Sequence, residues 1–349
     1  MFGKYIRMRR AERFNPVRKH GWPRLSMTLA KDRMKGAEGC AVGRENLALA
    51  RQIRRETSAY LWTSVDYMPS SVLYALVLFA ALTHAAWNAM VKGSSDRLLM
   101  LTSIRVVGFC AGLLVASLVP RPEAESIPFL LAATAVHYLY YFLILNIYRV
   151  GDLSQVYPIA RGSAPLLVAL LAALLADEVL GVQSVLAIAV LSTGILMLTL
   201  SGRAFNRKAV GLALLTGVSI AGYSVLSGMG TRCSGSLLGY IAWLEIATGA
   251  GMVVVAYVRR RKVLREYART QWRTGLVAGL LSVSGYAIAL WAMSILPMAS
   301  VVALRETSVV FGAMIGSIYL GEGFAARRSV AAATVLLGVV LLSLGAKAA

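Results

Sequence analysis

The chain contains long, uninterrupted apolar segments, and their length constrains the fold more than any other feature of the sequence. Each runs for about 17–25 residues, the length that a helix needs to cross a hydrocarbon layer of about 30 Å. A half-buried strand would alternate apolar and polar residues, whereas these segments are continuously rich in Ala, Leu, Val and Gly. We therefore expect membrane-spanning α-helices, because a helix satisfies its own backbone hydrogen bonds in lipid. A hydrophobic content of 58% agrees with this class.

Polar and turn-forming residues divide the apolar segments into ten predicted spans. The spans are 70–91, 98–119, 127–148, 154–176, 182–200, 209–230, 236–257, 274–294, 298–320 and 328–345. Five fall in each half of the chain, and an odd number makes the second half enter the membrane from the opposite side. The predicted fold is an all-α integral membrane protein with ten transmembrane helices in two inverted five-helix repeats, residues 68–202 and 203–349.

Two of the spans have the pattern of one duplicated segment. QVYPIARGSAPLLVALLAALLADE and ASVVALRETSVVFGAMIGSIYLGE align without a gap at an offset of 144 residues. In this alignment Arg161 meets Arg305, and Glu178 meets Glu322. A duplicated half with a charged residue at the same depth in each copy is how many secondary transporters form a substrate site.

These segments and the helices that follow them resemble the EamA-like branch of the drug/metabolite transporter superfamily. The likeness is carried by LLADEVLGVQSVLAIAVLSTGILML and IYLGEGFAARRSVAAATVLLGVVLL. Each is an apolar helix that ends near a Glu, a short turn, and a helix with a glycine at mid-span. The first copy departs from the family pattern, because Asp177 stands where Gly would precede the Glu. The resemblance runs from about residue 70 to the C-terminus and implies transport by alternating access, without specifying a substrate.

Arg161 and Arg305 are the first candidates for a substrate site. Each lies about eight residues, or about 12 Å, from the start of its span, and the two spans run in opposite directions. Both guanidinium groups are therefore expected near the middle of the bilayer. An arginine there costs about 2.5–3.5 kcal/mol on insertion scales, so it must face protein, water or an anion. Either the two arginines converge on a cavity and bind a carboxylate or phosphate, or each joins helices structurally.

Glu306 breaks the symmetry of the repeat, because Gly162 occupies the equivalent position in the first copy. A buried carboxylate beside an arginine either exchanges a proton during transport or acts as a fixed counter-ion of Arg305 or Arg161. Arg105 and Glu245 lie at roughly equivalent places in the two halves, where they are candidates for an ion pair between the repeats.

Two groups of polar and aromatic residues are further candidates for substrate contact. His84, Trp87 and Asn88 share one helical face by their i, i+3, i+4 spacing. His137 shares a face with Tyr141 in the third span. Such histidines either relay protons or pack as neutral, hydrogen-bonded residues.

Other residues are expected to shape or move helices. Glu178 and Glu322 end their spans beside tight turns, which favours a capping or gating role at the membrane edge. Pro158 and Pro165 fall inside the fourth span and Pro297 begins the ninth, where prolines bend helices.

No catalytic constellation is present in the sequence. Cys40, Cys110 and Cys233 form no metal-binding spacing. There is no Walker loop, HExxH motif or GxSxG nucleophile elbow. We expect no catalytic residue, no metal site and no cofactor, and therefore a protein that is not an enzyme.

Residues 1–67 carry fifteen Lys and Arg against six Asp and Glu, and contain no apolar run long enough for a signal-peptide core. They are either a basic arm attracted to anionic lipid or nucleic acid, or a disordered or non-native extension before a start at Met68. The basic connections, above all 259–273, predict that the odd-numbered connections face the cytoplasm and both termini lie outside. A native basic arm would oppose that orientation.

The expected function is secondary transport of a small polar or anionic metabolite across the bacterial inner membrane, with protons as a candidate coupling ion. The expected partners are the substrate and the lipid bilayer, with no nucleic acid, and the protein acts as a monomer or a homodimer. One alternative is a broad exporter of amphipathic compounds, with tyrosines binding the substrate. Others are a membrane-embedded lipid-handling enzyme that uses Glu306, His84 or His137 as acid–base groups, and a scaffold that recruits a partner.

Overall fold

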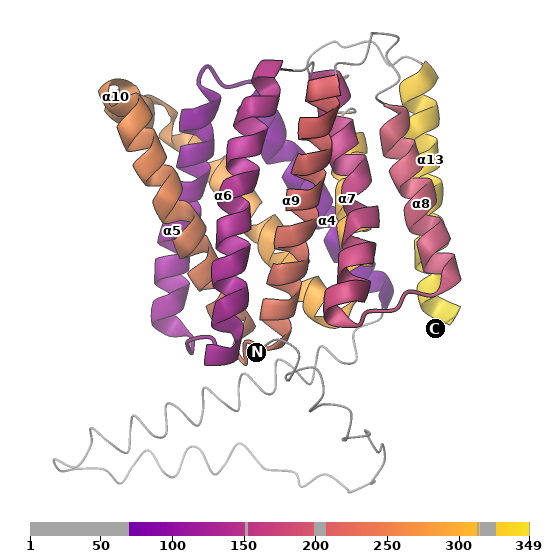
Figure 1. The fold of residues 1–349 in the computed structure, drawn as a ribbon. Helices are drawn as coiled ribbons and strands as arrows, with labels where there is room; N and C mark the ends of the chain where they lie inside the picture. Colours follow the sequence, from indigo (N-terminus) through magenta and orange to yellow (C-terminus); the bar gives the residue numbers. More distant parts are fainter. Residues whose placement is uncertain (1–69, 151–152, 199–206, 313, 315–325, 349) are drawn as a thin grey trace, which may run out of the picture. The chain divides into compact units, whose positions relative to one another are not determined.

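The computed structural model is mostly helical in the residues it describes, which are 70–150, 153–198, 207–312, 314 and 326–348 (Figure 1). The basic segment 1–67 lies outside the described residues. The helices are α4 (Ser70–Lys92), α5 (Arg97–Leu118), η3 (Ala124–Ser126), α6 (Ile127–Val150), α7 (Leu153–Ala176), α8 (Val182–Met197), α9 (Arg207–Arg232), α10 (Leu237–Ile295), α11 (Met298–Glu306) and α13 (Ala326–Ala348). No strand is found in the described ranges.

Six helices within the described residues are long and apolar enough to cross a membrane. Two shorter apolar helices, Val182–Met197 and Ser329–Leu344, add to them. Large apolar side chains lie exposed on the outer faces of the helices, among them Leu114, Phe142 and Leu174. Because such faces are stable only against lipid or another apolar surface, the protein is a multi-pass membrane protein.

The basic connection predicted between spans 236–257 and 274–294 is itself helical. α10 runs for 59 residues with non-helical backbone angles only at Arg260 (φ −133°, ψ 20°). No glycine or proline lies between Gly251 and Gly275, and the Arg, Lys, Glu, Leu and Ala residues there favour helix. A straight helix of this length would measure about 90 Å. The bend instead turns the helix back on itself (Figure 1).

The structure interrupts the helix of the predicted span 298–320 at Thr307. α11 ends at Glu306, and the helical residues resume only after Thr307. The Thr307 hydroxyl donates to the Leu304 carbonyl at 2.6 Å, a local bond of the kind that competes with helix continuation. Arg305 therefore lies in the last turn of α11, where the carbonyl ends of the helix favour a cation.

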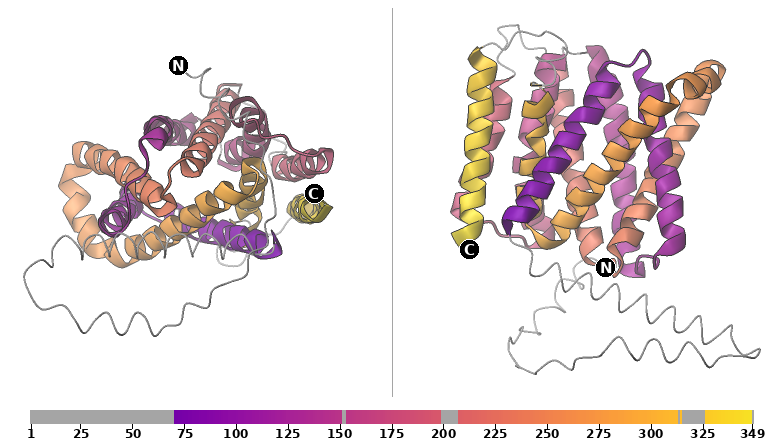
Figure 2. Two further views of the ribbon diagram at one scale, coloured as in Figure 1. Left: turned by 90° about the horizontal axis from the view of Figure 1, so that it is seen from below. Right: turned by 180° about the vertical axis from the view of Figure 1, so that it is seen from behind.

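The helices pack in pairs that are distant in sequence. α5 lies along α10, α8 lies along α13, and α9 packs against both α6 and α7. The paired α8 and α13 are seen side by side in both views of Figure 2. Small residues permit these close approaches, because a Cβ on Gly112 would lie 2.7 Å from the Ala242 carbonyl oxygen.

The α8–α13 contact is made twice by equivalent residues. A Cβ on Gly194 would lie 2.8 Å from the Val335 nitrogen, and a Cβ on Gly338 would lie 2.8 Å from the Leu191 nitrogen. Adding 144 to 194 and 191 gives 338 and 335, so each contact maps onto the other under the offset of the duplicated segment. This reciprocity is the geometry of a two-fold axis between the helices.

Candidate functional site

A cavity of about 240 Å³ lies among seven helices, and most of the predicted site residues line it. α4 contributes His84, Trp87 and Asn88, and α6 contributes His137 and Tyr141. The arginines come from three further helices. They are Arg97 and Arg105 of α5, Arg161 of α7 and Arg305 of α11.

Arg161 and Glu306 form a buried ion pair beside this cavity. Arg161 Nη1 donates to Glu306 Oε1 at 2.8 Å, and the two side chains are only 4% and 3% exposed. Glu306 therefore acts as the counter-ion of the arginine in the other half of the chain, although it follows Arg305 in sequence. Pro165 lacks an N–H, so it also releases the Arg161 carbonyl from the helical ladder of α7.

His84 brings the two equivalent arginines together. Arg161 Nη2 lies 2.5 Å from His84 Nε2, and Arg305 Nη2 lies 3.3 Å from His84 Nδ1. The guanidinium of Arg305 also lies over the Tyr286 ring, 5.3 Å from its centroid. Among the described residues Arg305 has no carboxylate partner, and its buried Nε has no hydrogen-bond partner. The two guanidiniums thus converge on one imidazole, with only one of them neutralised by an acid.

Arg105 forms a second ion pair with a carboxylate from the other half of the chain. Its Nη1 lies 3.2 Å from Glu245 Oε2, and its Nη2 donates to Ser282 Oγ at 2.8 Å. Gly108 makes room for this carboxylate, because a Cβ there would lie 2.3 Å from Glu245 Oε2. Of the arginines that line the cavity, Arg105 and Arg161 thus have carboxylate partners, whereas Arg305 has none among the described residues.

His137 is hydrogen-bonded within its own helix and stacked among aromatic rings. Its Nδ1 lies 2.8 Å from the Ala133 carbonyl, which can only accept, so Nδ1 carries the proton. Its ring stacks on Tyr223 with centroids 4.1 Å apart and meets Tyr286 edge-on at 6.0 Å. These contacts favour the interpretation of His137 as a neutral packing residue of the cavity wall.

Trp87 and Asn88 support His84 from the same face of α4. The Trp87 ring meets the His84 ring edge-on at 4.9 Å. Asn88 Nδ2 donates to the His84 carbonyl at 2.7 Å. The i, i+3, i+4 spacing therefore places all three side chains at the cavity.

Sequence reasoning missed several cavity residues, among them Tyr157, Ser282 and Tyr286. Tyr157 lies one helical turn before Arg161, and its ring lies 5.4 Å from that guanidinium. Ser282 and Tyr286 are four residues apart on α10, so helical spacing could have placed them on one face. Nothing in the local sequence indicates that this face meets the arginines.

Glu178 lies outside the cavity and caps α11. Both of its carboxylate oxygens accept from the Met298 backbone N–H, at 2.9 and 3.2 Å. Arg232 of α9 pairs with the same carboxylate at 3.3 Å and donates to the Leu296 carbonyl. Glu178 thus joins the ends of three helices at one end of the bundle. Glu322, its predicted equivalent, lies outside the described residues.

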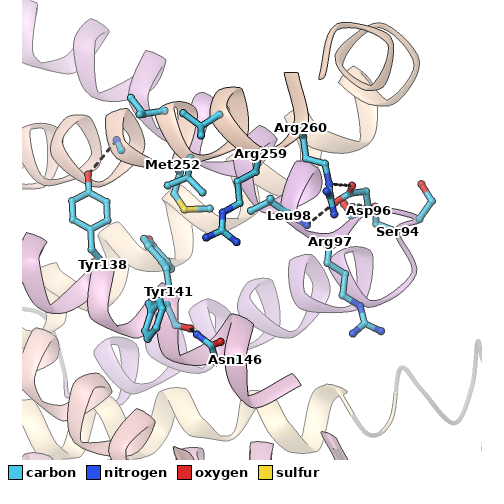
Figure 3. Close-up of a pocket in the computed structure, with 16 residues that line it drawn as sticks. Ser94, Asp96, Arg97, Leu98, Tyr138, Tyr141, Asn146, Met252, Arg259 and Arg260 are labelled. Carbon is cyan, nitrogen blue, oxygen red and sulfur yellow. Dashed lines mark hydrogen bonds and ion pairs between the residues drawn. The ribbon is translucent and has the colours of Figure 1, made fainter. Parts of the chain in front are cut away.

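A second, larger pocket of about 1020 Å³ adjoins the cavity between α6 and α10 (Figure 3). The two share Arg97, Tyr141 and Met252 in their walls. At its rim Arg260 Nε pairs with Asp96 at 3.0 Å, which ties the bend of α10 to the start of α5. Much of its wall is apolar, including Leu98, Phe142, Val254, Val255 and Val258.

A known family model matches the second half of the chain. Residues 207–344 match the EamA-like transporter family. This part of the chain is similar to EamA-like transporters. The predicted resemblance to the EamA-like branch of the drug/metabolite transporter superfamily is therefore confirmed over these residues.

Solved structures share the fold of this chain. One, described only as "Crystal structure of protein", has a TM-score of 0.61 at 18% sequence identity. The match covers 80% of this chain and 99% of the other. At this identity the likeness concerns the fold alone. A search of curated proteins finds no match.

Proposed function

We propose that this protein is a secondary transporter that moves a small organic anion by alternating access around the central cavity. The observation that carries this proposal is the charge of the cavity. Arg161 and Arg105 each have a carboxylate partner, whereas Arg305 has none among the described residues. A cation held in a largely apolar bundle without a counter-ion is costly, and an anionic substrate supplies the missing charge.

The proposed architecture is ten transmembrane helices in two inverted repeats, 68–202 and 203–349. In this scheme α10 provides two spans joined at the bend, and residues 298–320 provide one. The family match over 207–344 and the reciprocal glycine contacts of α8 and α13 support it. Rocking of one repeat against the other would open the cavity to alternate sides.

The proposed location is the bacterial inner membrane, with the basic bend of α10 in the cytoplasm. Arg259, Arg260 and Arg261 lie at that bend. Glu178 and Arg232 then form a contact that closes the external end of the bundle. Protons remain the proposed coupling ion, and Glu306 the proposed carrier.

Counterflow in reconstituted vesicles tests the proposal. Vesicles loaded with single small organic anions are scored for exchange with the labelled compound, first with the wild-type protein and then with Arg305→Gln. Exchange should fall by about tenfold or more in the variant, because a charge-assisted bond to the substrate is lost. Arg121→Gln is the matched control, since Arg121 is exposed and lies outside the cavity. Normal anion exchange by a folded Arg305→Gln variant would refute the proposal.

A second candidate function is export of amphipathic compounds. The observation that favours it is the large, mostly apolar pocket that shares Tyr141 and Met252 with the cavity. An apolar molecule could enter by this route from between α6 and α10. Efflux of an uncharged fluorescent amphipath that survives Arg305→Gln would identify this function.

A further inference from the structure

The contact of two guanidiniums with one imidazole contains a hydrogen-bond conflict. Arg161 Nη2 and Arg305 Nη2 lie 2.5 Å and 3.3 Å from the two ring nitrogens of His84. Guanidinium nitrogens only donate, whereas a neutral imidazole has one acceptor nitrogen and one N–H. In a doubly protonated ring, both imidazole N–H groups would face the N–H donors of a guanidinium. His84 is therefore neutral, and it accepts from only one of the two arginines.

The shorter contact identifies the acceptor. Arg161 donates to Nε2, so the ring proton lies on Nδ1 and faces Arg305 Nη2. That second contact brings two donors together and is not a hydrogen bond. The Nε of Arg305 is buried and also has no acceptor among the described residues. Since Nε–H and one Nη2–H lie along the same edge of the guanidinium plane, this edge is a two-donor fork without an acceptor.

We infer that the Arg305 Nε–Nη2 edge and the His84 Nδ1–H form the subsite for a carboxylate group. One carboxylate oxygen would accept from Nε, and the other from both Nη2 and the imidazole N–H. Because the bound anion accepts from both Arg305 Nη2 and His84 Nδ1–H, hydrogen bonds would replace the repulsion between these two donors. Arg161 is a positioning residue in this scheme, because its bond to Nε2 directs the ring proton toward the subsite. The inference rests on the proposed function and specifies which chemical group of the substrate the cavity recognises.

The charges of Arg105, Arg161 and Arg305 favour a substrate with a single negative charge. Glu306 offsets Arg161 and Glu245 offsets Arg105, which leaves the single charge of Arg305 among these three; the fourth arginine of the wall, Arg97, also lines the second pocket. A monocarboxylate makes the group neutral, whereas a dianionic phosphate would leave one excess negative charge in a buried site. The Tyr286 ring under Arg305 and the Trp87 ring beside His84 supply apolar surface for the rest of the molecule.

Calorimetric titration of the full-length protein in lipid nanodiscs tests the subsite with three probes of similar shape. Benzoate should bind about tenfold tighter than uncharged benzamide and than dianionic phenylphosphonate. Arg305→Lys keeps the charge but removes the fork, and His84→Phe keeps the ring but removes the N–H. Each should weaken benzoate binding by about tenfold. Arg121→Lys, the matched control at an exposed position outside the cavity, should bind benzoate like the wild type.

Nitrogen NMR of the ¹⁵N-histidine-labelled wild-type protein reports the position of the ring proton in the unaltered site. The His84 signals, assigned by their loss in His84→Phe or by selective contact shifts, should report a proton on Nδ1, and benzoate should shift the Nδ1 signal more than the Nε2 signal. A proton on Nε2, or equal benzoate affinity in wild type, Arg305→Lys and His84→Phe, would overturn the subsite. If counterflow of anions persists in that case, transport stands and only the subsite is wrong. Benzoate binding without anion counterflow would instead support the subsite and refute the transport proposal.

Discussion

Arg161 and Arg305 occupy equivalent positions in the duplicated segment, yet their surroundings differ in charge. Arg161 lies inside α7 and is paired with Glu306, whereas Arg305 lies at the end of α11 beside His84 and Tyr286. The difference comes from Glu306. It follows Arg305 in the chain, but successive residues of a helix point about 100° apart, so it reaches the arginine of the other half. Glu306, which has no equivalent in the first repeat, thus pairs with Arg161 and leaves Arg305 available to an anion.

The largest expected effect comes from breaking the paired side of this comparison. Glu306→Gln leaves the Arg161 charge buried without a counter-ion, and should lower the free energy of unfolding by about 3–5 kcal/mol. Unfolding in mixed detergent micelles measures this change. The double variant Arg161→Gln/Glu306→Gln should recover part of the loss, because it removes the uncompensated charge. If the single and double variants lose stability equally, the ion pair is not what Glu306 contributes.

The second ion pair can be disturbed without removing a charge. Gly108→Ala places a methyl group where the Glu245 carboxylate meets Arg105, and should destabilise the protein by about 1–2 kcal/mol as the carboxylate moves. Gly211→Ala is the matched control, because a Cβ there meets nothing within 4 Å. That substitution should be neutral or stabilising by up to about 1 kcal/mol. Equal effects of the two glycine substitutions would show that the Arg105–Glu245 contact is unimportant for stability.

The capping contact at Glu178 should matter less. Glu178→Ala removes the acceptor of the Met298 N–H and should cost about 1 kcal/mol of unfolding free energy, whereas Glu178→Gln keeps an acceptor oxygen and should cost less. The same micelle unfolding assay measures both. A larger loss in the Gln variant than in the Ala variant would contradict the capping role.

The smallest effect on stability is expected at Arg305, the unpaired side of the comparison. Arg305→Gln removes a charge without leaving a carboxylate behind, so the free energy of unfolding should change by less than about 1 kcal/mol in either direction. A loss as large as that of Glu306→Gln would mean that Arg305 is as structural as Arg161. The difference in unfolding free energy between Glu306→Gln and Arg305→Gln therefore measures how far Arg161 is structural and Arg305 is not.

Much of the site followed from the sequence because helical spacing and duplication are local signals. The spacing of His84, Trp87 and Asn88 placed them on one face, and the alignment placed Arg161 and Arg305 at equivalent depths; all five line the cavity. The helical bend at Arg260 and the interruption at Thr307 were not predicted. Both depend on single backbone positions, whereas hydropathy averages over a whole span.

The sequence by itself determined that this is a helical membrane protein that resembles EamA-like transporters, because long apolar segments and a repeated motif are local features of the chain. Only the tertiary structure decided which carboxylate neutralises which arginine and that one imidazole lies between both guanidiniums. Those contacts join residues more than 70 positions apart. Their charge balance therefore depends on how the helices pack, which no local pattern specifies.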